Sequence, residues 1–165
     1  MKIIDNFLPL PEFKNLQSFM MGDRFDWYYN TRSIYGRFKG PSQFQFTHTF
    51  YHTTPPWNGE TRTYDVIAPC VEQLKVKRLY RAKANLLTKT MFHKTTGFHV
   101  DLDFPCTTAV FYLNSCNGYT KFKKGPKVKS VANRIVIFDS QIQHSGFTCT
   151  DENTRVVVNF NYEGN

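Results

Sequence analysis

Apolar and polar positions alternate in short segments along the second half of the chain, from residue 77 to residue 162. The pattern predicts seven or eight strands separated by turn signals, of which Asn117-Gly118 and Gly125-Pro126 are the clearest. The candidate strands lie at residues 79–87, 97–104, 107–114, 119–124, 127–133, 134–140, 146–150 and 154–162. Many short strands with regular turns are typical of a jelly roll or a similar double-sheet sandwich.

The first part of the chain has a different pattern. Residues 3–7 are expected to form a short strand, and apolar residues at helical spacing predict helices over 11–21 and 64–74. Between these helices, residues 23–63 are rich in aromatic residues, and their alternation at 44–51 predicts one strand with long loops. We therefore expect a mainly β fold with supporting N-terminal α-helices.

Length and composition favour one soluble domain over residues 1–165, with 1–76 as helical and loop support and 77–162 as the jelly-roll core. Hydrophobic residues at 41% and aromatic residues at 16% exclude a disordered chain. No apolar run approaches the roughly 18 to 20 residues of a membrane span. The N-terminus lacks a signal-peptide core, and four widely spaced cysteines suggest reduced thiols. We expect a cytoplasmic protein that does not bind a membrane.

The net charge of +8 favours acidic partners, such as nucleic acid, acidic peptides or dianionic metabolites, without choosing among them. Part of this charge lies in residues 75–78 and part in residues 121–129. The simplest interpretation of both runs is a solvated surface.

The segment 96–105 carries the most informative polar residues. His99, Asp101 and Asp103 alternate with apolar residues, so in a strand they would share one face. His99 and Asp101 would then lie about 6 to 7 Å apart and could reach one ion. Two histidines and one carboxylate form the facial triad that holds ferrous iron with open coordination positions. A second histidine is therefore expected on a distant strand, and Asp103 remains an alternative carboxylate.

His144 is the candidate for that second histidine, because it follows the apolar strand at 134–138 after a short turn. Arg155 opens the apolar strand at 156–160. A cation at the start of a core strand is costly unless it meets an anion. A guanidinium pairs well with a carboxylate, such as the far end of an oxo-diacid that chelates a metal.

Taken in order, the segments FHVD, AVFYLNSCNGYTKF, SVANRIVIFDS and HSGFTCTDENTRVVVNFNY resemble the iron(II)- and 2-oxoglutarate-dependent oxygenases. The likeness is greatest to the prolyl-4-hydroxylase-like branch, of which small members occur in bacterial viruses. It covers roughly residues 78–162, with weaker similarity in the opening IIDNFLP.

The resemblance implies a double-stranded β-helix with Fe(II) held by His99, Asp101 and His144. It also implies 2-oxoglutarate as co-substrate, with its C5 carboxylate bound by Arg155 and Tyr112. The family usually has a further tyrosine on the strand before the HxD motif, but LYRAKANLLTKT has leucine there. Asn85 or Lys83 is the expected substitute.

Family chemistry implies O2 as oxidant, with ascorbate as an optional reductant, and couples conversion of 2-oxoglutarate to succinate and CO2 with hydroxylation of a C–H bond. Related halogenases lack the carboxylate ligand, so Asp101 favours hydroxylation or oxidative demethylation. Our first hypothesis is a hydroxylase acting on a peptide or protein side chain, proline being one candidate.

Two alternatives remain at this point. A nucleic-acid demethylase or base hydroxylase would use the positive charge and the aromatic residues between 27 and 57. A non-catalytic jelly-roll binding protein would keep only the scaffold. His48, His52 and His93 are expected to be surface or loop residues in any of these cases.

Overall fold

The computed structural model describes residues 1–31, 44–53 and 59–164. Trp57 and residues 32–43 of the aromatic region considered for nucleic-acid binding therefore lie outside the described residues. The elements are β1 Lys2–Ile4, α1 Leu10–Met20, β2 Tyr28–Asn30, β3 Gln45–His52, β4 Gly59–Glu60, a 3-10 helix at Tyr64–Ile67, α2 Ala68–Gln73, β5 Val76–Thr88, β6 Thr107–Tyr112, β7 Tyr119–Phe122, β8 Lys127–Lys129, β9 Arg134–Asp139, β10 His144–Phe147 and β11 Thr154–Gly164.

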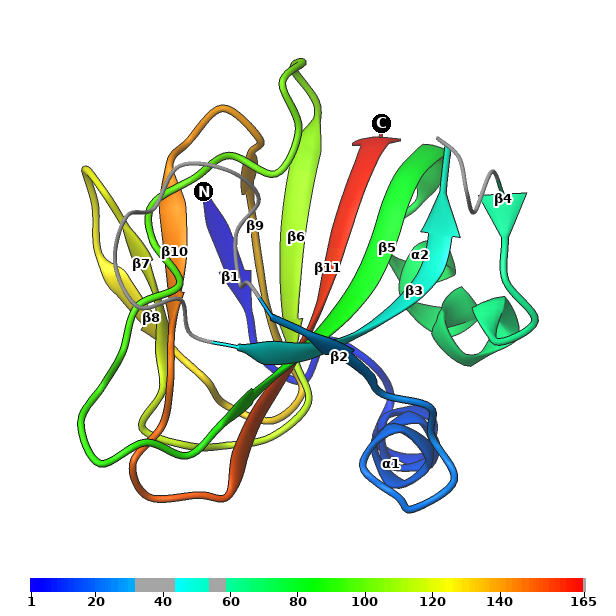
Figure 1. Cartoon of the computed structure of the whole chain (residues 1–165). Coiled ribbons are helices and arrows are strands. Elements are labelled where there is room, and N and C mark those ends of the chain that lie inside the picture. Colours follow the sequence, from blue (N-terminus) through cyan, green and yellow to red (C-terminus); the bar gives the residue numbers. More distant parts are fainter. Residues whose placement is uncertain (32–43, 54–58, 165) are drawn as a thin grey trace.

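Two antiparallel sheets form the body of the molecule (Figure 1). The larger sheet has the strand order β1-β9-β6-β11-β5-β3-β2, with β4 paired to β3, and the smaller sheet has the order β10-β7-β8. From β6 onward the chain passes repeatedly between the two sheets, with β7, β8 and β10 in the smaller sheet and β9 and β11 in the larger one, as in a double-stranded β-helix. The predicted mainly β fold is confirmed. Among the described residues, no helix is both long enough and apolar enough to cross a membrane.

The larger sheet has one apolar face and one mixed face, because side chains alternate along each strand. Its apolar face packs against the two helices in one hydrophobic cluster, which includes Phe13, Leu16, Ile67, Ala82, Ala84, Phe111, Val156, Val158 and Phe160. The opposite face of β11 carries Arg155, Val157, Asn159 and Asn161. This second face lies toward the smaller sheet, so the polar groups of the site are held between the two sheets.

The opening segment is fixed to the larger sheet through Asn133. Its side-chain amide donates to the carbonyl of Leu8 at 2.8 Å and its amide oxygen accepts from the Leu8 N–H at 2.9 Å. Asn133 has a positive φ of 62°, a conformation that Asn tolerates better than most residues. The opening IIDNFLP, which weakly resembles the oxygenase family, is thus the segment that binds Asn133 at the end of SVAN.

Three local predictions differ from the structure. Residues 97–104 form no regular strand, because Gly97 takes a positive φ of 89° and Pro105 has no N–H to donate to a ladder. The predicted helix at 64–74 begins as a 3-10 turn and becomes α2, with a proline in its first turn. His48 is not a surface residue but is buried in β3, with its ring centroid 4.4 Å from that of Phe25.

Candidate active site

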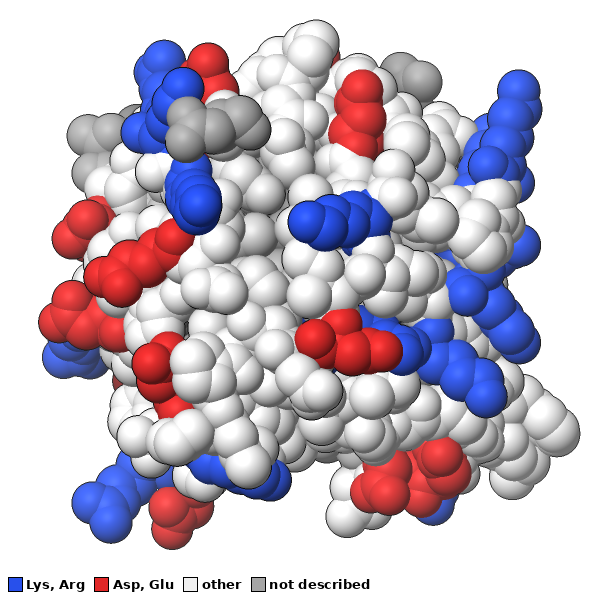
Figure 2. Space-filling view, turned by 180° about the vertical axis from the view of Figure 1, so that it is seen from behind, with Lys and Arg blue, Asp and Glu red and all other residues white. Residues whose placement is uncertain are grey.

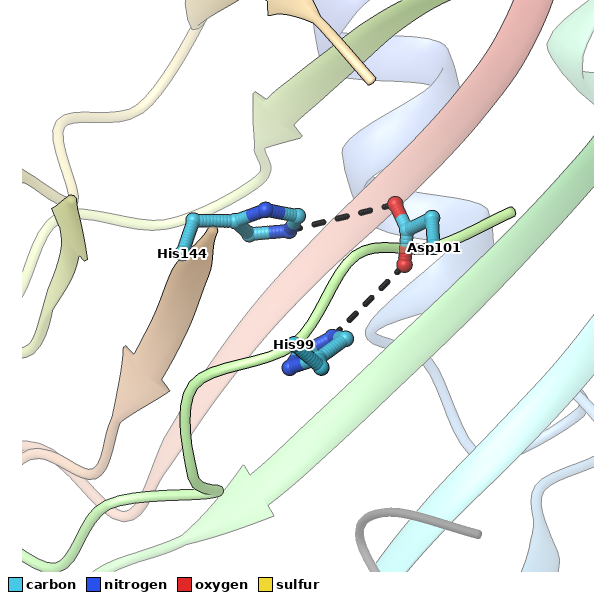
Figure 3. Close-up of side chains that lie close together, drawn as sticks. All are labelled: His99, Asp101 and His144. Carbon is cyan, nitrogen blue, oxygen red and sulfur yellow. Dashed lines mark ion pairs between the residues drawn. The ribbon is translucent and has the colours of Figure 1, made fainter. Parts of the chain in front are cut away.

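His99, Asp101 and His144 converge between the two sheets (Figure 3). The Nε2 atoms of His99 and His144 lie 3.6 Å and 3.9 Å from the two carboxylate oxygens of Asp101. Residue 99 is aligned with residue 144 by a pair of backbone hydrogen bonds, each 3.0 Å long. The two histidines are therefore juxtaposed by this bridge, and the chain after His99 turns Asp101 toward both rings.

Hydrogen bonds to the backbone fix the orientation of both rings. The Nδ1 atom of His99 lies 2.9 Å from the carbonyl of Gly97, and that of His144 lies 3.2 Å from the carbonyl of Ile142. A carbonyl only accepts, so each Nδ1 carries the proton and each Nε2 presents a lone pair toward Asp101. This arrangement of the second ring nitrogen is typical of metal-ligating histidines.

The chemistry of these three groups suits a divalent cation. The Nε2 atom of His144 is buried and has no hydrogen-bond partner, which is costly unless something occupies its lone pair. Two imidazole nitrogens and one carboxylate are the donor set of non-haem iron(II) centres with open positions. The residues present therefore fit a bound Fe(II).

The charge of Asp101 is stabilised by its surroundings. Burial alone would raise its pKa, but Arg81, at 2.8 Å from one carboxylate oxygen, and the two histidines hold the pKa well below its usual range. Burial lowers the pKa of His144. For His99 the effect of burial is outweighed by Asp101, so its pKa is raised. Asp101 is thus an anion at every physiological pH, as a metal ligand must be.

Arg155 lies at the other end of the same region and has no anionic partner among the described residues. Its side chain is buried, and Nε donates to the Ser130 hydroxyl at 2.7 Å while Nη2 donates to the Thr120 hydroxyl at 3.0 Å. The guanidinium also lies over the ring of Tyr112, 5.5 Å from its centroid. A buried cation that is bonded only to neutral groups is expensive, so this end of the site suits an anionic ligand.

A single cavity connects the two groups. Its lining includes Arg155 and Thr120, the two converging histidines His99 and His144, and the side chains Gln45, Asn85, Leu87, Thr96, Val110, Val157 and Asn159, together with Gly146. A ligand with a carboxylate at each end can therefore contact Arg155 and the metal site at once. The apolar side chains among these residues offer contacts for the methylene groups between the two carboxylates.

Gly118 leaves the room that Arg155 needs. A Cβ atom at this position would lie 2.6 Å from Cδ of Arg155 and 3.0 Å from the carbonyl oxygen of Phe147, both too close for ordinary contact. The Asn117-Gly118 pair that signals a turn in the sequence thus has a second consequence. The glycine leaves room for the Arg155 side chain beside the start of β7.

The other residues expected at the site differ in whether they line the cavity. Asn85 lines the cavity, on the strand beside Arg155. Tyr112 is fully buried and donates to the Thr120 hydroxyl at 2.9 Å, without itself lining the cavity. Asp103 is exposed, while Asp101 is the carboxylate that meets the histidines. Lys83 lies two residues before Asn85 on β5.

Sequence reasoning missed three residues that the structure brings into the site: Thr120, Ser130 and Arg81. The two hydroxyl residues bind the guanidinium of Arg155, and Arg81 binds Asp101. A threonine within β7 and a serine after β8 carry no signal of their own. Arg81 was visible only as a basic residue within an otherwise mixed strand.

Comparison with known proteins finds similarity in structure alone. No protein-family model and no curated protein matches the sequence. A prolyl-4-hydroxylase from Pseudomonas putida aligns with a TM-score of 0.62 at 15% identity, covering 99% of this chain and 92% of that chain. A prolyl hydroxylase from Trichoplax adhaerens, in complex with a hypoxia inducible factor peptide, aligns with a TM-score of 0.62 at 13% identity, covering 98% and 83%.

A third similar structure is the epimerase SnoN in complex with Fe3+, alpha ketoglutarate and nogalamycin RO. It aligns with a TM-score of 0.61 at 13% identity, covering 98% of this chain and 78% of that chain. The chain therefore has the fold shared by these proteins over almost its whole length, which confirms the expected resemblance in fold.

Proposed function

We propose that this protein is an Fe(II)- and 2-oxoglutarate-dependent dioxygenase that hydroxylates a C–H bond and releases succinate and CO2. In this proposal His99, Asp101 and His144 hold the iron, and Arg155 binds the C5 carboxylate of 2-oxoglutarate. The observation that carries it is one cavity with two unsatisfied ends: a buried imidazole lone pair at one end and a buried guanidinium without an anion at the other.

The hydroxyl of Thr120 would complete the binding of the carboxylate. Its oxygen accepts hydrogen bonds from both Tyr112 and Arg155, so its own proton is left to donate into the cavity. Tyr112 then acts through Thr120 and the guanidinium rather than by direct contact. Asn85 would contact the co-substrate from the neighbouring strand, as a substitute for the tyrosine that related enzymes usually have on that strand.

The apolar residues of the cavity and Arg81 have roles that follow from their chemistry. Leu87, Val110 and Val157 exclude water around the two methylene groups of 2-oxoglutarate. Arg81 holds the Asp101 carboxylate in one orientation through the 2.8 Å ion pair. Iron, when bound with the co-substrate, supplies the oxidising chemistry that splits O2 between succinate and the hydroxylated product.

We further propose that the whole of residues 1–165 acts as one catalytic domain and that its substrate is a peptide or protein side chain, proline being one candidate. The fold it shares with a prolyl hydroxylase that binds a peptide supports a peptide substrate. The helices of the N-terminal part support the larger sheet from its outer face, and residues 77–162 supply every side chain of the proposed iron centre.

A nucleic-acid substrate is a second candidate, favoured by the charge of +8. Lys and Arg gather along the edge that corresponds to the side of β7 and β8 (Figure 2). Binding through phosphates would weaken steeply with salt, so titration of a single-stranded oligonucleotide between 50 and about 200 mM salt tests this candidate. Salt-insensitive or absent binding would remove it.

The proposed activity is tested by aerobic incubation with Fe(II) and 2-oxoglutarate while succinate is measured. We expect slow succinate formation without substrate, and none from His99→Ala. Fresh, folded protein that binds iron yet forms no succinate, with or without candidate peptides, would contradict the proposal. Calorimetric titration with Mn(II), an oxygen-stable substitute for Fe(II), measures metal binding independently of activity.

A further inference from the structure

One strand of the larger sheet extends the site beyond the co-substrate cavity. On β5, Asn85 lines the cavity and Arg81 binds Asp101. Lys83 lies between them in the sequence, and because side chains alternate along a strand it points to the same face. Across the sheet, Lys83 pairs with Asn159 on β11 and with Thr49 on β3. Lys83 is thus placed next to the proposed iron centre, away from Arg155.

Lys83 is a partly buried cation without a compensating anion. Among the described parts of the chain, no residue forms a hydrogen bond or ion pair with it. Burial, and then the nearby charge of Arg81, lower its pKa to about 8, although Asp101 acts in the opposite direction. Asp101 is already bonded to Arg81 at 2.8 Å. The carboxylate therefore does not neutralise both cations.

Neighbouring polar atoms are also left without partners. The Nε atom of Arg81 and the Oδ1 atom of Asn159 are buried and make no hydrogen bond. A free guanidinium N–H and a free ammonium group are donors suited to a carboxylate. The amide of Asn159, which lines the cavity, is suited to a peptide group. Arg81 contacts Asp101, and Asn159 lies opposite Lys83 in the sheet, so these atoms belong to the strands beside the proposed iron centre.

The local charge balance favours an anion as well. With a divalent ion and dianionic 2-oxoglutarate bound, the positive charges of the ion, Arg81 and Lys83 exceed the negative charges of Asp101 and the co-substrate by one. Arg155 adds a further positive charge at the far end of the cavity. A neutral substrate side chain, such as that of proline, would leave this excess unbalanced in a partly buried site.

We infer that Lys83, together with the Nε atom of Arg81, binds the side-chain carboxylate of an aspartate or glutamate that is itself the residue hydroxylated. This inference rests on the proposed function and narrows its substrate class. Lys83 is only two residues from both Arg81 and Asn85, so an anion held there lies close to the iron centre. An acidic side chain has its C–H bonds one or two carbons from its carboxylate, whereas a nucleotide phosphate is separated from its base by the sugar.

Blocked pentapeptides of sequence Gly-Gly-X-Gly-Gly, with X as Asp, Glu, Asn, Gln or Pro, test the inference. Their affinities are measured by calorimetry for protein loaded with Mn(II) and 2-oxoglutarate. We expect the Asp or Glu peptide to bind at least about tenfold more tightly than its amide counterpart, and Lys83→Met to abolish that difference. Lys77→Met, an exposed lysine at the start of the same strand, is the matched control and should retain it.

Chemical labelling gives a second readout that does not depend on turnover. Lys83 should react readily with acetic anhydride because of its lowered pKa, and the acidic peptide should protect it while the amide peptide does not. Free aspartate and a phosphoserine peptide distinguish a side-chain carboxylate from an α-carboxylate and from a phosphate. Preferential binding of either, or equal binding of acidic and amide peptides, would overturn the inference.

The inference and the proposed function fail in different ways. If Lys83 instead contacts 2-oxoglutarate, Lys83→Met will weaken 2-oxoglutarate binding as strongly as Arg155→Met does, and the substrate inference falls while the oxygenase proposal stands. If the protein binds neither Mn(II) nor 2-oxoglutarate, the proposed function itself is wrong.

Discussion

The two ends of the cavity differ in how their buried charges are compensated. At the metal end, the buried carboxylate of Asp101 is surrounded by Arg81 and two histidines, so its charge is compensated within the protein. At the far end, the buried guanidinium of Arg155 is bonded only to the neutral groups of Ser130 and Thr120. Among the described residues, the metal end thus leaves the lone pair of His144 Nε2 without a partner, whereas the far end lacks an anion for its buried cation.

This difference predicts which substitution should weaken the binding of which ligand. The metal end depends on lone pairs that a cation occupies, because the Nε2 atom of His144 is otherwise unsatisfied. The Arg155 end depends on the negative charge of an anionic ligand, which we propose is 2-oxoglutarate. Substitutions at one end should therefore affect one ligand first, and four predictions test that separation in order of expected effect.

The largest effect is expected at Asp101. Asp101→Asn removes the anionic ligand and should weaken Mn(II) binding by at least about 100-fold, since loss of even an indirect contact to a metal ligand costs 10- to 100-fold. Succinate formation should fall below detection. Asp103→Asn, which changes an exposed carboxylate two residues away, is the matched control. Equal loss in both variants would show that the ligand is misassigned.

Arg155→Met should weaken 2-oxoglutarate binding by about 100-fold. Each hydrogen bond to a charged group contributes roughly 1.5 to 3 kcal/mol, and about 1.4 kcal/mol corresponds to a factor of ten. Binding of Mn(II) should change by less than a factor of about three, because the arginine does not contact the metal ligands. Calorimetry with each ligand measures both values, and a parallel loss of metal binding would contradict the separation of the two ends.

Smaller effects are expected from residues that position Arg155. Thr120→Val removes the hydroxyl that accepts from Arg155 and Tyr112 and that would donate to the carboxylate, and it should raise the dissociation constant for 2-oxoglutarate by roughly tenfold. Gly118→Ala should have a similar effect, because the new Cβ would meet Cδ of Arg155. Thermal unfolding with saturating 2-oxoglutarate gives an independent readout, since the ligand should stabilise the wild type more than either variant. An unchanged shift would show that neither residue supports the arginine.

The pH dependence of acidic-peptide binding should be the smallest effect. Lys83 faces Arg81 on its own strand, His52 on β3 and Asp101 on the loop, and its pKa lies at about 8. Above that pH the ammonium group loses its proton and its attraction for a carboxylate. A bound anion raises this pKa, so affinity should fall only as pH rises above about 8. Lys83→Arg should bind the peptide without this fall, and an identical pH profile would contradict the assignment.

Residue types and their order predicted which side chains the structure brings together at the candidate site, but not the contacts that support them. His99, Asp101 and His144 were recognisable because few arrangements place two histidines and a carboxylate in this order among strands. Arg155 was recognisable because a cation opens an apolar strand. The partners Thr120 and Ser130 depend on how β7 and the segment after β8 meet β11, and sequence spacing does not specify that packing.

Local geometry was predicted less well than chemistry. Alternation placed His99 and Asp101 on one face of a strand, whereas the structure brings them together on an irregular segment held by the bridge to His144. An alternating sequence shows which side chains are polar, but it does not show whether a neighbouring strand is available to form backbone hydrogen bonds. Alternation was reliable in β5 and β11, because β5 pairs with β11 and β3, and β11 pairs with β5 and β6. These pairings determine the face of the sheet on which Lys83 lies.

The central claim is that a metal at one end and Arg155 at the other bind a single molecule of 2-oxoglutarate. Calorimetric titration of 2-oxoglutarate into wild type, Asp101→Asn, Arg155→Met and the double variant, each with Mn(II) present, tests it most directly. We expect tight binding only in the wild type and at least tenfold weaker binding in each single variant. Wild-type affinity in Arg155→Met, or unchanged affinity when the metal ligand is lost, would contradict the account.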